Sequence, residues 1–454
     1  MKKITLLTII VAFLLSICSC SAISSLIGDN SSDNNGADVE EDVGNPPSGE
    51  DVEEGNNGSG NNTESGDVGG DGMNDNINTP IAEVLPVKGG AKGIVVLIHD
   101  DAKSPTGIIF DELLSKYGLV ADVAMPLSSV YNSATGEVKA SNYATWSELC
   151  SNGRWKIVSH SATHTWWGLA EEDGEGGYTF SDNEKKLYDE VVASQTILRN
   201  LFKGQRVLTF AYPGFSAEKK LYAYENGKQS QSKILDIIYS ENSRELIDET
   251  YISARVGNSN LPLVTDDSTV WNYLAAYSLS NGSVKNGGAL QYVNRAINEG
   301  GLAVMYAHNL AIVDESMLET YEYPSNTMAA YYMESICSYV SEKVSRGILW
   351  CTHYEDAVMY IREAQTSTVS IDEIDDHSFA LTLTDGMDDE IYDAPLTVKI
   401  TLPDGWSGAK IATECDTIYA EAKVVNGKSV INIDLVPNGY TVVVERADPS
   451  DWKN

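Results

Sequence analysis

Residues 93–101 read Gly-Ile-Val-Val-Leu-Ile-His-Asp-Asp and join an apolar run directly to two carboxylates. An unbroken run of this kind is typical of a strand buried on both faces of a parallel sheet. Two later runs end in the same way: residues 155–158 lead to His160 and His164, and residues 301–306 lead to His308. Carboxylates and imidazoles gathered at strand ends are the components of a metal site with an acid and a base beside it. The pattern therefore indicates a metal-dependent hydrolase.

Between residues 89 and 365 short apolar runs alternate with longer amphipathic stretches. The strand candidates are 93–98, 120–124, 155–159, 207–211, 234–239, 252–255, 302–307 and 348–352. Helices are predicted from Ser181, where Glu184 completes a capping box, and over 327–344. Because parallel strands need long crossovers, seven or eight such alternations predict an α/β fold with a distorted (β/α)7-8 barrel. The carboxyl ends of barrel strands meet at one mouth, so distant residues can form one site.

After residue 365 the pattern changes to short alternating segments separated by turn signals such as Pro403-Asp404-Gly405 and Asn438-Gly439. About seven such segments over 366–447 predict a small, Ig-like β-sandwich. Trp406, Tyr419 and Tyr440 are either core and turn residues of this domain or a face on which sugars stack.

The amino-terminal segment is predicted to direct the protein out of the cytoplasm. Lys2 and Lys3 precede an apolar stretch over residues 4–15, as in a signal peptide. Cys20, after Ile17-Cys18-Ser19, resembles the acylated cysteine of a bacterial lipoprotein, which predicts a signal peptide over 1–20 and a lipid anchor to the membrane. The alternative is an ordinary cleaved secretory signal. In both cases we expect a location at the cell envelope, either periplasmic or on the cell surface.

Residues 21–85 are predicted to form a disordered acidic linker. They are rich in Gly, Asn, Asp, Glu and Ser, and no Lys or Arg occurs between Lys3 and Lys88. Such a composition cannot bury enough apolar surface to fold, and its like charges extend it.

Bulk charge and cysteine spacing exclude some classes of function. The net charge of −35 over 454 residues argues against nucleic acid as a partner and favours a neutral or cationic ligand. Cys150, Cys337, Cys351 and Cys415 lack CxxC spacing, so we expect buried free thiols rather than a structural zinc site.

The core resembles the polysaccharide deacetylases that share the NodB-homology domain, carbohydrate esterase family 4. The resemblance covers about 89–365. The family's Thr-Phe-Asp-Asp-Gly motif appears as residues 98–102, its His-Ser/Thr-x-x-His motif is intact at residues 160–164, and its Leu-x-His motif appears as residues 306–308. The resemblance implies that Asp101, His160 and His164 bind a divalent metal, that Asp100 is the general base and that His308 is the general acid.

The chain also departs from the family pattern. The Arg-x-Pro-Tyr motif aligns best with residues 211–214, so Ala211 stands where an Arg is expected, and Arg255 at another strand end is a candidate replacement that would orient the base. Further candidates for oxyanion stabilisation or substrate contact are Gly214, Tyr212, Trp271 and His353. For His99 and His353, a structural role is an equal alternative.

These residues predict a metal-dependent hydrolase that removes acetyl groups from an N- or O-acetylated polysaccharide or oligosaccharide. The cofactor expected for two His and one Asp is Zn²⁺, with Co²⁺, Ni²⁺ and Mn²⁺ as alternatives. A second hypothesis is a glycan-binding surface lipoprotein that retains the metal but, without the motif Arg, has little or no catalysis. A third is a hydrolase of related fold with a non-carbohydrate substrate.

Overall fold

The computed structural model describes residues 79–164, 170–172, 178–180, 188–213, 220–225, 228–236, 241–413 and 416–452. The predicted signal peptide with Cys20, the linker up to residue 78, the capping box at Ser181 and Cys415 lie outside these residues. Within the described part, no helix is long and apolar enough to cross a membrane.

Seven parallel strands close into a barrel, which confirms the predicted architecture. The hydrogen-bonded order is β2-β3-β6-β9-β12-β13-β14, and β14 pairs back with β2 along residues 94–99. The strands are β2 (Gly93–Asp100), β3 (Ala121–Met125), β6 (Trp155–Ser159), β9 (Thr209–Ala211), β12 (Ser253–Gly257), β13 (Leu274–Ser278) and β14 (Leu302–Ala307).

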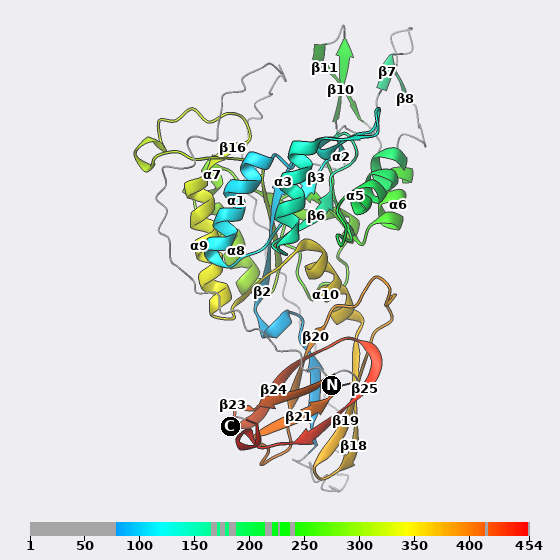
Figure 1. Ribbon diagram of the computed structural model, residues 1–454, viewed down its shortest axis with the longest axis vertical. Helices are drawn as coiled ribbons and strands as arrows, with labels where there is room; N and C mark the ends of the chain where they lie inside the picture. The colour runs from blue at the N-terminus through cyan, green and yellow to red at the C-terminus, as the bar shows by residue number, and fades with distance from the viewer. Residues whose placement is uncertain are drawn as a thin grey trace, which may run out of the picture. The chain divides into compact units, whose positions relative to one another are not determined.

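Helices surround these strands, and Figure 1 shows α1, α3, α8 and α9 beside the barrel. The helices are α1 (Ser104–Tyr117), α2 (Leu127–Val130), α3 (Ala140–Ser151), α5 (Ser194–Leu201), α6 (Glu241–Thr250), α7 (Asn281–Lys285), α8 (Gly288–Glu299), α9 (Ala330–Ser345) and α10 (Tyr354–Thr366). A π-helical turn, η3 (Asp189–Ala193), leads into α5. The helix expected over 327–344 is α9, which begins three residues later than predicted because 327–329 form strand β16.

Short strands lie outside the barrel sheet. They are β4 (Tyr131–Asn132), β5 (Glu137–Val138), β7 (Ala170–Glu172), β8 (Tyr178–Phe180), β10 (Lys220–Glu225), β11 (Lys228–Asp236), β15 (Asn309–Ala311) and β16 (Thr327–Ala329). The 3-10 turns of the described residues are η2 (Lys88–Gly90), η4 (Trp271–Tyr273), η5 (Glu315–Met317) and η6 (Pro449–Asp451).

The last strand of this domain, β17 (Leu349–Cys351), is not an ordinary barrel strand. It pairs with residues 93–95 of β2, whereas β3 pairs with residues 98–100 of the same strand. Since β14 occupies the other edge of β2, β17 lies beside the amino-terminal half of β2 and β3 beside its carboxyl-terminal half. The end of β17 therefore lies away from the barrel mouth.

One predicted barrel strand was wrong and one was missed. Residues 228–236 form β11, which pairs antiparallel with β10 in a separate hairpin, and residues 237–240 lie outside the described part. The barrel strand in this part of the chain is β13, whose sequence Leu-Ala-Ala-Tyr-Ser carries a weaker apolar signal. The hairpin was mistaken for a barrel strand because a short apolar run does not reveal its pairing partner.

The carboxyl-terminal residues form two antiparallel sheets around one apolar core, as expected for a β-sandwich. The strands are β18 (Thr368–Asp375), β19 (Ser378–Thr384), β20 (Leu396–Thr401), β21 (Gly408–Ala412), β22 (Thr417–Glu421), β23 (Lys423–Val425), β24 (Lys428–Leu435) and β25 (Asn438–Arg446). Strand β1 (Ile81–Val84), placed in the linker by its sequence, pairs with β20 and completes one sheet. Trp406 is buried in the core, whereas Tyr419 and Tyr440 are exposed.

The side chains of β2 alternate between two environments. Ile94, Val96 and Ile98 pack with strand residues such as Val304, whereas Val95 and Leu97 pack with the surrounding helices. Because successive strand residues point to opposite faces, Asp100 continues the row that faces into the barrel. In the described part Cys150, Cys337 and Cys351 are free thiols, as expected, but only Cys337 is fully buried and the other two are partly exposed.

Candidate metal centre

Asp101, His160 and His164 come together at the carboxyl ends of β2 and β6. One ligand atom from each lies within 4.8 Å of the others. The Asp101 Oδ1 atom is 3.3 Å from His164 Nε2 and 3.9 Å from His160 Nε2. The structure thus brings together the three residues that the sequence singled out as metal ligands.

The backbone turns sharply at these ligands. Asp101 has a φ of 71° and His164 a φ of 59°, and Ala102 and Ser161 beside them also have positive φ. Side chains other than glycine rarely adopt this region, and such residues cluster at functional sites. The turn after β2 ends the alternation of side chains between the two faces of the strand. The adjacent residues Asp100 and Asp101 can therefore take separate roles.

The donor atoms fit a divalent metal ion. Asp101 Oδ1 is a buried oxygen without a hydrogen-bond partner in the described part of the chain. His160 Nδ1 lies 2.7 Å from the Ala211 carbonyl oxygen, so it donates there and leaves the Nε2 lone pair facing Asp101. Burial lowers the pKa of His160 to about 4, which keeps the imidazole neutral at neutral pH, as metal binding requires. Two imidazoles and a carboxylate suit zinc and its first-row neighbours.

A buried glutamate that the sequence did not single out holds the loop between the two histidines. Glu190 in η3 accepts hydrogen bonds from the Thr163 backbone N–H at 2.9 Å and from its hydroxyl at 2.6 Å. His164 N also donates to Ser161 Oγ at 3.0 Å. These contacts hold residues 161–164 in place. The sequence offered no signal for Glu190, because its contact joins two separate segments.

Asp100 and Arg255 form a buried ion pair inside the barrel mouth. The Arg255 guanidinium donates to Asp100 Oδ1, and both side chains are at most 3% exposed. Arg255 also lies over the Tyr306 ring, 4.4 Å from its centroid. Burial raises the pKa of Asp100, but the charge and hydrogen bond of Arg255, together with His160 and His308, outweigh burial and hold that pKa below its ordinary value. Arg255 from β12 therefore holds the Asp100 carboxylate, whereas Ala211 has no side chain that could do so.

His308 completes the group. It follows β14, and its Nε2 lies 4.0 Å from Asp100 Oδ2 with the side chain 19% exposed. The imidazole thus reaches solvent on one side and the buried carboxylate on the other. The candidate base, Asp100, and the candidate acid, His308, thus lie together at the mouth that also holds the three candidate ligand residues.

Two predicted substrate residues, His353 and Trp271, lie away from the barrel mouth. His353 contacts Asp122 at 3.2 Å and the Gly153 carbonyl at 3.3 Å, both near the amino ends of barrel strands, because β17 ends there. Trp271 precedes β13, and its carbonyl accepts from Ser253 at the start of β12. Neither residue lines the mouth, so the prediction that they contact substrate was wrong.

Tyr212 is also unsuited to contact a substrate, because its side chain is buried and packs on Phe210. Its backbone N–H donates to the Arg255 carbonyl at 3.1 Å, so that donor is already used. Gly214 lies outside the described residues. His99 is buried and stacks on Trp146 with ring centroids 5.7 Å apart, as expected for a structural residue.

Arg255→Gln is expected to lower the free energy of unfolding by about 3–5 kcal/mol, because it leaves Asp100 as a buried carboxylate without its partner. The loss is measured as a lower midpoint in urea or thermal unfolding followed by circular dichroism. Arg295→Gln is the matched control, since it breaks only the exposed pair with Glu299 and should cost less than about 0.5 kcal/mol.

Combining Arg255→Gln with Asp100→Asn should recover part of the lost stability, because the carboxylate is then gone too. An Arg255→Gln protein as stable as the Arg295→Gln protein would contradict the buried pair.

Comparisons with known proteins were made for the whole chain. No family model matches it. A gellan lyase from a Bacillus species is 25% identical over 334 residues, which are 68% of this chain and 11% of that protein. The match thus spans a small part of the length of that relative.

Solved structures of carbohydrate esterases resemble the chain. A family 4 carbohydrate esterase from Streptomyces lividans in complex with acetate is 11% identical with a TM-score of 0.29, covering 57% of this chain and 92% of that one. A peptidoglycan deacetylase from Bacillus subtilis is 12% identical with a TM-score of 0.31, covering 60% and 95%. A family 4 pseudoenzyme from Bacillus anthracis is 12% identical with a TM-score of 0.29, covering 56% and 62%.

The chain is thus similar to family 4 carbohydrate esterases.

Proposed function

We propose that this chain is a metal-dependent deacetylase of carbohydrate esterase family 4 that acts on an N- or O-acetylated glycan. The observation that carries the proposal is one barrel mouth that holds the Asp101, His160 and His164 ligand set beside the Asp100–Arg255 ion pair and His308. Amide or ester hydrolysis needs an activated water, a base and an acid, and this arrangement has a residue for each task.

Asp101, His160 and His164 would hold the ion, which when bound would supply Lewis-acid activation of a water and of the acetyl carbonyl. Asp100 takes the proton from the attacking water. Its low pKa keeps it ionised at neutral pH, and Arg255 holds it in place. His308 lies on the open side and donates a proton to the departing amine or alcohol.

The ion pair also bears on the second hypothesis, a glycan-binding protein with little or no catalysis. That hypothesis rested on the absent motif Arg, and Arg255 reaches the same carboxylate from another strand. We therefore favour the active enzyme. The similarity to a protein named gellan lyase covers 11% of that protein and supplies no residue role at this mouth.

The proposal includes a place at the cell envelope. It rests on the signal-like residues 1–20 and on Cys20 as the acylated residue, followed by an acidic linker. An acetylated polysaccharide of the envelope or its surroundings would be within reach of a barrel tethered in this way.

Acetate release tests the proposed activity. The metal-loaded full chain is incubated with fragments of acetylated chitin, peptidoglycan and xylan, and free acetate is measured with time. We expect release from at least one of these and none after the metal is removed by a chelator. A protein with full metal occupancy that releases no acetate from any of them would instead support the glycan-binding hypothesis.

A further inference from the structure

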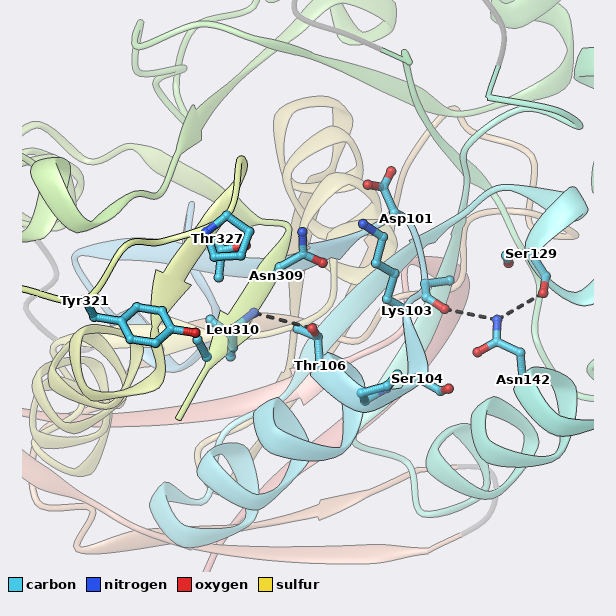
Figure 2. A pocket seen from close by; sticks show the side chains of 14 residues that line it. Asp101, Lys103, Ser104, Thr106, Ser129, Asn142, Asn309, Leu310, Tyr321 and Thr327 are labelled. Atoms are coloured by element: carbon cyan, nitrogen blue, oxygen red, sulfur yellow. Dashed lines mark hydrogen bonds between the residues drawn. The ribbon is translucent and has the colours of Figure 1, made fainter. Parts of the chain in front are cut away.

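A cavity of about 590 Å³ opens beside Asp101, one of the three candidate ligand residues. Asp101 lines it, and its walls come from the start of α1, from α3 and from the β15 and β16 region after His308. Figure 2 shows Asp101, Lys103 and Asn309 around this space. Its size fits about one or two sugar rings, in the range of ordinary ligand pockets.

Among the described residues that line the cavity, Lys103 is the only cationic one and Asp101 the only acidic one. The Lys103 side chain is exposed and forms no ion pair within the described part of the chain. Several other lysines in that part, such as Lys116 and Lys285, have acidic partners. If Asp101 binds the ion, Lys103 remains as an uncompensated positive charge at the cavity.

The backbone that carries Lys103 is fixed. Its carbonyl accepts from the Gly107 N–H at 3.0 Å and lies 3.3 Å from His99 Nε2. The preceding Ala102 carbonyl accepts from Asn142 Nδ2 at 3.1 Å and from Trp146 Nε1 at 2.8 Å. The ammonium group therefore starts from a defined place, and Figure 2 shows the side chain extending toward the space between Asp101 and Asn309.

The rest of the lining suits a sugar. Asn309, Thr327 and Ser104 offer neutral polar groups, and Tyr321 offers an aromatic ring that is 38% exposed. Neutral hydrogen-bonding groups and one ring are what carbohydrate recognition needs. One unpaired cation in such a lining adds a preference for an anionic group.

We propose that Lys103 selects substrates in which a carboxylate lies on the acetylated sugar or on its immediate neighbour. This inference rests on the proposed function. The Cα atoms of residues 101 and 103 are at most about 7 Å apart, so a carboxylate bound by Lys103 would lie on the sugar held at Asp101 or on its neighbour.

The overall charge of −35 favours a neutral or cationic ligand at long range. Lys103 acts at contact distance, so within the cavity it favours an anionic group instead.

The test compares acetylated oligosaccharides that carry a carboxylate with the same compounds after the carboxylate is reduced to an alcohol. One series carries a uronic acid and another carries the lactyl ether carboxylate of muramic acid, so the two sources are measured separately. We expect kcat/KM to be about 10-fold higher for the carboxylate form in at least one series, and the difference to lie in KM. Lys103→Gln should reduce this ratio to near one, and Lys103→Arg should retain it.

Lys203→Gln is the matched control, because Lys203 is an exposed lysine of the barrel domain that does not line the cavity. It should leave the ratio as in the wild type. A wild-type ratio near or below one in both series would overturn the proposal, as would a Lys103→Gln protein that keeps the wild-type ratio.

Binding provides a readout that does not depend on turnover. Isothermal titration with the deacetylated, carboxylate-bearing oligosaccharides should show about 10-fold weaker binding for Lys103→Gln than for the wild type. If no acetate is released from any compound but this difference is present, the proposed activity fails while the role of Lys103 stands. Equal binding by the two proteins, with acetate release intact, overturns the role of Lys103 alone.

Discussion

Asp100→Asn is expected to lower the rate of acetate release by about 100- to 10,000-fold, the usual effect of removing a general base. The carboxylate lies in the barrel mouth next to Asp101, and its low pKa keeps it ionised at neutral pH, so it can accept a proton. An asparagine of the same shape can still accept a hydrogen bond from Arg255 but cannot take a proton. We therefore expect the loss in kcat rather than in KM.

The measurement is steady-state acetate release by the purified, metal-loaded variant, with circular dichroism to verify folding. The Arg255 charge loses its ionised partner in this variant, so the assay should be run well below the unfolding midpoint. Asp111→Asn is a useful comparison, because it removes a carboxylate paired with Arg154 outside the site. An Asp100→Asn enzyme with more than about a tenth of the wild-type kcat would rule out Asp100 as the base.

His160→Ala is expected to weaken metal binding by more than about 100-fold, because even the loss of a residue that only supports a ligand costs about 10- to 100-fold. His160 is buried, and its Nδ1 is held by the Ala211 carbonyl, so neither water nor a neighbouring side chain replaces it easily. Competition with a chromophoric chelator gives the dissociation constant for Zn²⁺.

His377→Ala is the control for that measurement, since His377 lies in an exposed turn of the sandwich domain. It should bind Zn²⁺ as tightly as the wild type. Equal affinity of the His160→Ala protein and the wild type would exclude His160 as a ligand.

The site residues at strand ends could be predicted because their local sequence carries the information. An apolar run specifies a buried strand, and the carboxyl ends of parallel strands share one mouth. Asp100, Asp101 and His308 each follow such a run. His160 and His164 could be placed together because their His-x-x-x-His spacing lies within one short segment after a strand.

The errors came from contacts that local sequence does not encode. His353 follows an apolar run too, but β17 lies beside the amino-terminal half of β2, so the end of that strand points away from the mouth. The role of Arg255 depended on strand register, because only the inward-facing row of β12 can reach Asp100. The contact of Glu190 with Thr163 and the position of Lys103 at the cavity join segments that are brought together only in the folded chain.

The metal content of three proteins compared side by side tests the central claim most directly. Wild type, Asp100→Asn and His160→Ala are saturated with Zn²⁺, dialysed against metal-free buffer and analysed for bound metal. We predict about one ion per chain in the wild type and in Asp100→Asn, and far less in His160→Ala. Loss of the ion in Asp100→Asn with retention in His160→Ala would contradict the assignment of Asp101, His160 and His164 as the ligands and of Asp100 as the base.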